Sequence, residues 1–119
     1  MKEYSDRSDL LLIFTDAYDV IVTGSQSELI SRFDEIAEKE ERYGNLAGSS
    51  LRVLISAEDL IWPDRSLEPQ YPMTPYKRFL CSGGIIAYAD TFYQLLNYKD
   101  VEDGDDDQLF YTKAFLDKG

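Results

Sequence analysis

The stretch "LLLIFTDAYDVIV", residues 10–22, is an apolar run that two acids interrupt. Charged residues precede positions 10–14 and Asp16 follows them, so this segment is predicted to be a strand buried on both faces. The apolar character continues to Val22, and Gly24 predicts a turn. Asp16 and Asp19 therefore follow the expected end of a strand, where they can be turn formers or ligands of one hard divalent cation.

The residues that follow predict a helix and then a second strand. Ser25 and Glu28 have the spacing of a capping box, and apolar residues then recur at helical spacing until a predicted end before Gly44. Residues 51–58, "LRVLISAE", predict a second strand that also ends in an acid. Strand, helix and strand in this order predict an α/β domain with a parallel sheet.

The second half of the chain alternates irregular and regular segments. Residues 62–76 contain all four prolines and predict irregular surface chain. Residues 77–89 are apolar, and Gly83–Gly84 predicts a bend or the close approach of a ligand to the backbone. Residues 90–98 predict a helix with Asp90 as its N-cap. Residues 108–116 predict another helix, with the inward positions Leu109, Phe110, Ala114 and Phe115.

Composition excludes several classes of function. The 119 residues suit one domain or part of one, and 44% hydrophobic residues predict a packed globule. A net charge of −11 disfavours binding to nucleic acid, including a two-metal nuclease, and to anionic membranes. The chain has no histidine and one cysteine, which excludes Ser-His and Cys-His nucleophiles and histidine-based zinc sites. Carboxylates must therefore carry most of any chemistry.

Neither a signal peptide nor a membrane span is predicted. The first nine residues, "MKEYSDRSD", have no apolar segment of the kind that signal peptides contain. No stretch approaches the ~18 apolar residues of a membrane span. We therefore expect no insertion into a membrane.

Beyond Asp16 and Asp19, three segments are candidates for a site. The acidic run "EDGDDD", residues 102–107, directly precedes a predicted helix, although such runs are usually solvated loops. Trp62 follows the strand that ends at Glu58; it can stack on a sugar or a base, but a lone tryptophan more often belongs to the core. In "CSGG", Ser82 can donate a hydrogen bond and the two glycines allow a ligand close to the backbone, or they form a tight bend.

Together these segments resemble a known family. "IFTDAYDVIV", "SAEDLIWPD", "KRFLCSGGIIAYA" and "DDDQLFYTKAFLD" occur in the order seen in the glycosyltransferase domain of the procollagen lysyl hydroxylase family. The chain is similar, more distantly, to other collagen glycosyltransferases. The resemblance implies a GT-A-type, Rossmann-like fold with a mostly parallel sheet flanked by helices. It also implies transfer of glucose or galactose from a UDP-sugar to hydroxylysine or galactosyl-hydroxylysine of collagen-like chains, with Mn²⁺ or alternatively Mg²⁺.

The resemblance also assigns roles to residues. It implies that Asp16 and Asp19 bind the metal, that the aspartates 105–107 are catalytic, and that Trp62 lies near the sugar. The catalytic set is then Asp105, Asp106 and Asp107, and the substrate-binding set is Trp62, Glu58, Ser82, Gly83 and Gly84.

The family pattern further includes an upstream strand-helix segment and a downstream histidine ligand, which residues 1–119 do not contain. We therefore expect one partial glycosyltransferase-like domain lacking N- and C-terminal parts. A non-catalytic remnant or partner-binding module with a weak cation site is the alternative. The resemblance places the protein in the lumen of the endoplasmic reticulum or elsewhere in the secretory pathway.

Overall fold

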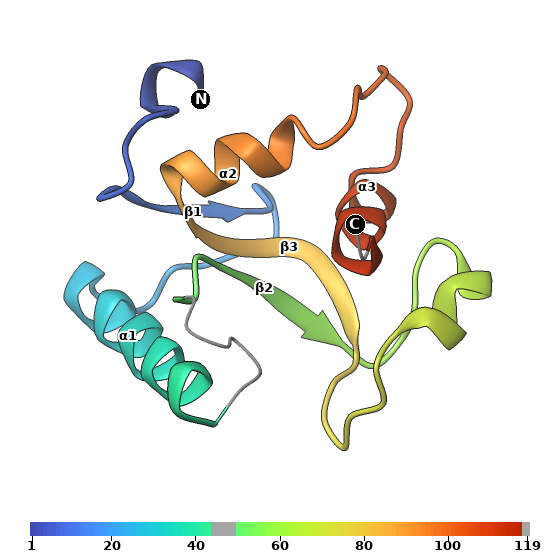
Figure 1. The fold of residues 1–119 in the computed structure, drawn as a ribbon, viewed down its shortest axis with the longest axis horizontal. Coiled ribbons are helices and arrows are strands. Elements are labelled where there is room, and N and C mark those ends of the chain that lie inside the picture. The colour runs from blue at the N-terminus through green and yellow to red at the C-terminus, as the bar shows by residue number, and fades with distance from the viewer. Residues whose placement is uncertain (44–49, 118–119) are drawn as a thin grey trace. The chain divides into compact units, whose positions relative to one another are not determined.

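A computed structural model describes residues 1–43 and 50–117, which form two compact units. The larger unit contains residues 1–15 together with those from 53 onward, and the smaller contains residues 16–52. The smaller unit contains the helix α1 (Gln26–Tyr43). The larger unit contains, in chain order (Figure 1), η1 (Lys2–Tyr4), β1 (Leu11–Thr15), β2 (Val53–Glu58), η2 (Arg65–Gln70), β3 (Phe79–Tyr88), α2 (Ala89–Leu96) and α3 (Asp107–Leu116).

The sheet of the larger unit has three strands in the order β1-β3-β2, and both pairings are antiparallel. Figure 1 shows β3 lying between the other two strands. The α/β class is confirmed, but the predicted mostly parallel sheet is wrong for the described residues. β1 and β2 do run in the same direction, as a strand-helix-strand unit requires. They are not neighbours, however, because β3 pairs with both, and an apolar pattern does not encode which strand lies beside which.

β3 passes through both glycines without a break. Ile55 pairs with Ile85 and Ser56 with Cys81, so residues 82–84 of β3 form a bulge opposite β2. The predicted interruption at Gly83–Gly84 is therefore a curved, continuous strand (Figure 1). A Cβ atom on Gly84 would lie 2.5 Å from Ser56 Oγ, so a side chain there would have to displace that hydroxyl of the neighbouring strand.

The core of the larger unit is formed by residues of β3, of the connection between β2 and β3, of α2 and of α3. Tyr71 is central: its ring packs edge-on against Phe79 at 5.2 Å, and its hydroxyl lies 3.2 Å from Thr112 Oγ1. Thr112 is buried, and this hydrogen bond gives its hydroxyl a partner. The buried cluster consists of Ile61, Tyr71, Phe79, Leu80, Ile85, Ala87, Phe92 and Tyr111.

The burial of β1 and α3 differs from the sequence prediction. In β1, Ile13 and Phe14 are exposed, so burial on both faces is wrong; β1 is an outer strand of the described sheet and is covered less. In α3, Phe115 is 54% exposed, while Tyr111 and Thr112 are buried instead. The remaining predicted inward residues, Leu109, Phe110 and Ala114, are half-buried.

Helix starts were predicted with mixed success. Ser25 Oγ accepts a hydrogen bond from the Glu28 backbone N–H at 3.2 Å, which confirms the predicted start of α1. Gly44, the predicted end signal, lies outside the described residues. The N-cap of α2 is Tyr88, two residues before the predicted Asp90, which lies instead in the first turn of the helix. The proline-rich segment is not wholly irregular, because residues 65–70 form η2.

None of the described helices is both long and apolar enough to cross a membrane.

Candidate functional site

The first turn of α3 is tied by one side chain to the end of β2, to the loop after it and to β3. Gln108 Nε2 donates to Glu58 Oε1 at 2.9 Å and to the Trp62 carbonyl oxygen at 3.3 Å. Gln108 Oε1 accepts from the Ser82 backbone N–H at 3.2 Å and from Ser82 Oγ at 3.4 Å. The structure thus brings together Glu58, Trp62 and Ser82, three residues that the sequence assigned to substrate binding.

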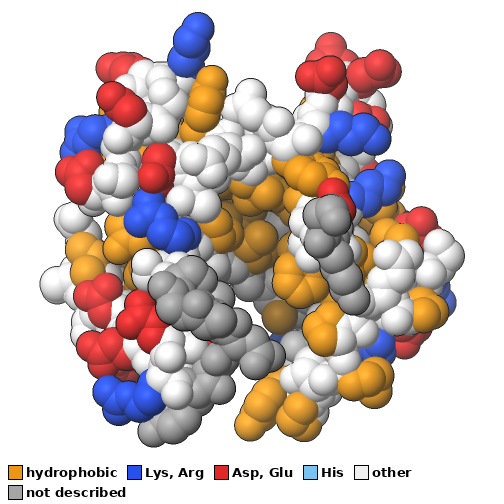
Figure 2. Space-filling model, viewed as in Figure 1, with side chains coloured by type: hydrophobic (Ala, Val, Ile, Leu, Met, Phe, Trp, Pro, Cys, Tyr) orange, Lys and Arg blue, Asp and Glu red, His pale blue; other side chains and the backbone are white. Residues whose placement is uncertain are grey.

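Asp105, Asp106 and Asp107 of the acidic run lie at the start of the same helix, and all three are exposed. Asp106 is the N-cap, its Oδ1 accepting from the Leu109 N–H at 2.9 Å. Asp107 Oδ1 accepts from the Gln108 N–H at 2.8 Å, and Asp105 Oδ2 accepts from the Glu102 N–H at 2.9 Å. Each carboxylate is therefore held through one oxygen. In Figure 2, acidic side chains gather over the loop that precedes α3, at the upper right.

Asp107 also influences the aromatic residue one turn further along α3. Burial raises the pKa of the Tyr111 hydroxyl, and the negative charge of Asp107 raises it further. The phenol therefore stays neutral well above physiological pH.

Trp62 lies on the surface, with 62% of its area exposed. The more frequent role of a lone tryptophan, burial in the core, is therefore wrong here, and the indole is available to stack on a ligand. The loop beyond it is fixed by Asp64, whose Oδ1 accepts from Ser66 N at 2.9 Å and from Ser66 Oγ at 2.6 Å. These hydrogen bonds lower the pKa of the Asp64 carboxyl.

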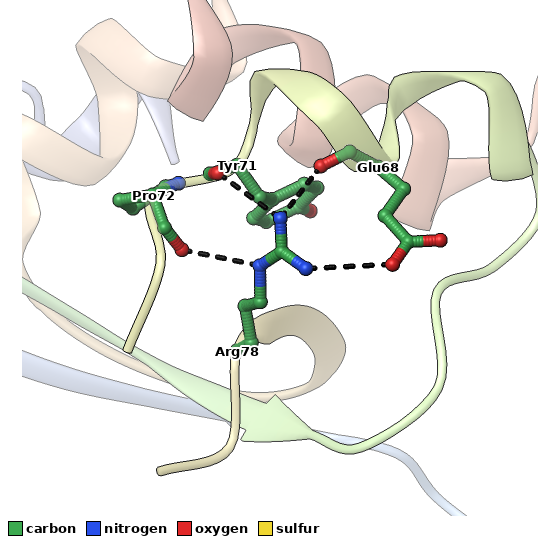
Figure 3. Close-up of polar contacts among 4 residues, drawn as sticks. All are labelled: Glu68, Tyr71, Pro72 and Arg78. Atoms are coloured by element: carbon green, nitrogen blue, oxygen red, sulfur yellow. Dashed lines mark hydrogen bonds and ion pairs between the residues drawn. The ribbon is translucent and has the colours of Figure 1, made fainter. Parts of the chain in front are cut away.

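The side chain of Arg78 holds residues 68–72 of the segment between β2 and β3 (Figure 3). Its guanidinium donates to the carbonyl oxygens of Glu68, Tyr71 and Pro72 at 2.9, 3.2 and 3.2 Å. It also contacts Glu68 Oε1 at 3.4 Å. The Arg78 backbone N–H donates to the Glu58 carbonyl oxygen at 3.2 Å, so this clamp is attached directly to the end of β2.

Gly84 of the candidate site has a structural function. Ser82 is buried, and its backbone lies in the bulge of β3, where β2 offers it no partner. Gly84 faces Ser56 closely, as described above. Whether Gly83 or Gly84 also contacts a ligand stays a prediction.

Asp16 and Asp19 belong to the smaller unit, in the segment between β1 and α1. Both are exposed. Within the described residues, no group of three or more histidine, cysteine or acidic side chains is arranged to hold a metal ion. Two exposed carboxylates suit Mg²⁺ or Mn²⁺ only where substrate oxygens and water complete the coordination. The donor chemistry fits a hard divalent cation whose other ligands are not protein side chains.

Comparison with known proteins defines the class. The family model described as "PLOD GT domain" matches residues 1–119. The chain belongs to this family, the glycosyltransferase domains of the lysyl hydroxylases, which confirms the resemblance found in the sequence.

Three relatives illustrate the match. The chain is 42% identical over 120 residues to human "Multifunctional procollagen lysine hydroxylase and glycosyltransferase LH3", with 100% of the chain and 14% of the relative covered. It is 43% identical over 118 residues to rat "Procollagen-lysine,2-oxoglutarate 5-dioxygenase 1", with 98% and 14% covered. It is 40% identical over 119 residues to the Caenorhabditis elegans "Multifunctional procollagen lysine hydroxylase and glycosyltransferase", with 99% and 15% covered. The chain thus spans about one seventh of these relatives.

Sequence reasoning did not single out Gln108. Its signal was weak, because an amide at the start of a helix is common and usually solvated. The bulge in β3 leaves the Ser82 N–H without a strand partner, and only the strand register reveals it.

Proposed function

We propose that this chain takes part in the metal-dependent transfer of glucose or galactose from a UDP-sugar. The proposed acceptor is hydroxylysine or galactosyl-hydroxylysine of a collagen-like chain. Membership of the PLOD GT domain family over all 119 residues carries the proposal. The names of the relatives, which include procollagen lysine hydroxylase and glycosyltransferase, indicate the same acceptor class.

In this proposal, Asp16 and Asp19 bind the metal that holds the UDP-sugar donor. Their carboxylates would hold Mn²⁺, or alternatively Mg²⁺, and the diphosphate and water would supply the other ligands. When bound, such a metal supplies Lewis-acid neutralisation of the charge on the leaving UDP. The exposure of both aspartates leaves their oxygens accessible for this purpose.

Residues of the larger unit are proposed to act on the sugar and the acceptor. Sugar transfer passes through an anomeric centre with cationic character, which carboxylates stabilise. Asp106 and Asp107, supported by Asp105, would stabilise that charge or accept the proton of the acceptor hydroxyl. The exposed Trp62 indole offers a face for the sugar ring. Gln108 links the Glu58 carboxylate to the Trp62 carbonyl oxygen through one shared donor group.

The acceptor and the compartment follow from the same assignment. A collagen-like chain that carries lysine is basic, and a protein of net charge −11 attracts it electrostatically. Relatives that modify procollagen support a location in the secretory pathway, and the proposed compartment is the lumen of the endoplasmic reticulum.

A calorimetric titration with UDP tests the donor site in the 119-residue chain and in any longer form that its gene encodes. We expect UDP to bind in the presence of Mn²⁺, and hydrolysis of UDP-glucose or UDP-galactose to follow the same metal dependence. Asp16→Asn and Asp19→Asn should weaken both. Asp34→Asn, which removes an exposed acid from α1, is the matched control and should change neither.

The same titration discriminates the alternative function. If no form binds UDP with Mn²⁺ and Asp16→Asn changes nothing, the transferase assignment fails. The chain would then be a non-catalytic, partner-binding module with at most a weak cation site.

A further inference from the structure

We infer that Gln108 is a positioning residue, which orients Glu58 and the Trp62 loop for the sugar and thereby joins them to the acidic start of α3. The inference rests on the proposed function, because it assigns these two residues to the sugar site. It adds a residue that neither composition nor motif spacing identified. The hydrogen bonds made by the Gln108 side-chain amide support this inference.

The orientation of the Gln108 amide is determined by its partners. The backbone N–H of Ser82 can only donate, so the oxygen of the amide must face it. The nitrogen then faces the Trp62 carbonyl and Glu58 Oε1, both of which accept. A flipped amide would place a donor against the Ser82 N–H and an acceptor against the Trp62 carbonyl.

All of the hydrogen-bonding capacity of this amide is used. Oε1 accepts two hydrogen bonds from Ser82, and Nε2 donates one to Glu58 and one to Trp62. An amide has two donors and two acceptor positions, so Gln108 has no further capacity to satisfy. Rotation away from this arrangement would break every one of these contacts, which fixes the relative placement of the segments they join.

Glu58 is consequently held at two points. The Arg78 N–H fixes its main chain, and Gln108 donates to its carboxylate, a charge-assisted contact that is stronger than one between neutral groups. The same Gln108 nitrogen contacts the carbonyl of Trp62, so the carboxylate and the indole-bearing residue share one donor group. Without Gln108, Glu58 would keep its backbone position but lose the contact that orients its carboxylate.

The test compares Gln108→Leu and Gln108→Glu with Gln94→Leu, a control that replaces an exposed glutamine of α2. Leucine removes all four contacts. Glutamate keeps the shape and an acceptor for Ser82 but sets a second carboxylate against Glu58. Trp62 is the one tryptophan of the chain, so its fluorescence anisotropy and acrylamide quenching report on this loop directly.

We expect both Gln108 variants to lower the Trp62 anisotropy and to increase quenching, while Gln94→Leu changes neither. In UDP-sugar hydrolysis, kcat/KM should fall by ~10- to 100-fold for Gln108→Leu, the scale of a small misplacement in an active site. Circular dichroism should show that Gln108→Glu retains its helix content.

Unchanged anisotropy and quenching in both Gln108 variants would overturn the inference, whatever the activity. Absence of turnover in the 119-residue chain and in every longer form would refute the proposed function, but the fluorescence would still decide whether Gln108 holds the Trp62 loop. If the wild type is active and the variants loosen Trp62 but keep the wild-type kcat/KM, the positioning role is refuted. The two failures are thus distinguishable.

Discussion

Replacing Gly84 by alanine tests whether this glycine serves the strand next to it or a ligand. A methyl group on Gly84 would lie 2.5 Å from Ser56 Oγ, which is closer than real Cβ atoms come. The Cβ of Ser56 itself would lie at 3.7 Å, an ordinary van der Waals distance. The conflict therefore involves one oxygen atom, and Ser56→Ala removes it without changing the backbone.

The expected magnitude follows from two opposing terms. Alanine in place of glycine stabilises a strand by ~0.5–1 kcal/mol, because the unfolded chain loses freedom. Overlap with Ser56 Oγ costs about 1–3 kcal/mol as the packing is forced apart. We therefore expect Gly84→Ala to lower the free energy of unfolding by about 1 kcal/mol in the natural sequence. In the Ser56→Ala background it should be neutral or stabilising.

Urea denaturation followed by circular dichroism measures the free energies for this double-mutant cycle. A change for Gly84→Ala that agrees in both backgrounds within ~0.5 kcal/mol would refute the reasoning, since contacting residues must couple. UDP affinity, measured on the same variants, separates the ligand alternative. If Gly84 contacts the donor, Gly84→Ala should weaken UDP binding equally with and without Ser56→Ala.

Three further predictions follow from the clamp, the helix cap and the buried phenol. Arg78→Lys should lower the free energy of unfolding in urea by about 1–3 kcal/mol, because an ammonium cannot replace a planar donor that serves three carbonyls. Arg65→Lys, at an exposed position, should lower it little. Equal losses in the two variants would contradict the role of Arg78 in holding this segment. Asp106→Ala should cost ~0.5–2 kcal/mol through the lost N-cap. Asp106→Asn should keep stability and lose transferase activity; if activity is retained, the carboxylate is not catalytic. The raised pKa of Tyr111 means that its contribution to stability is full below its unfolded pKa of ~10 and is lost as pH rises through the folded pKa. Thermal melts between pH 9 and about 11 should therefore fall less steeply for Tyr111→Phe than for the natural chain, and equal slopes would contradict the assignment.

Local features of the fold could be predicted from the sequence, and non-local ones could not. The cap at Ser25 is encoded within four residues, and the structure contains it. Residues 77–89 were recognised as apolar, but neither their continuity as one strand nor its neighbours was predicted, because an apolar run pairs equally well with strands on either side. Phe115 was predicted to point inward, but the hydroxyl pair of Tyr71 and Thr112 turns a different face of α3 toward the core.

The candidate site shows the same division. Glu58 and Trp62 were recognisable because Glu58 ends a strand, Trp62 follows it, and each is of a type that binds sugars or charges. Gln108 was not recognisable, because its importance depends on a bulge in β3 that leaves the Ser82 N–H available. A bulge arises from the register of two strands, which is a property of the pair and not of either sequence alone.

The acidic run combines a structural function with the proposed chemical one. Like charges at successive positions repel one another, and within the described residues no Lys or Arg forms an ion pair with Asp105, Asp106 or Asp107. A loop that served solubility alone would let these side chains move apart. Instead, each accepts a backbone N–H through one oxygen, and the helix dipole offsets part of the repulsion. The remaining negative charge is held in place and exposed, so a cationic anomeric centre or a basic acceptor chain would relieve repulsion that the free protein retains.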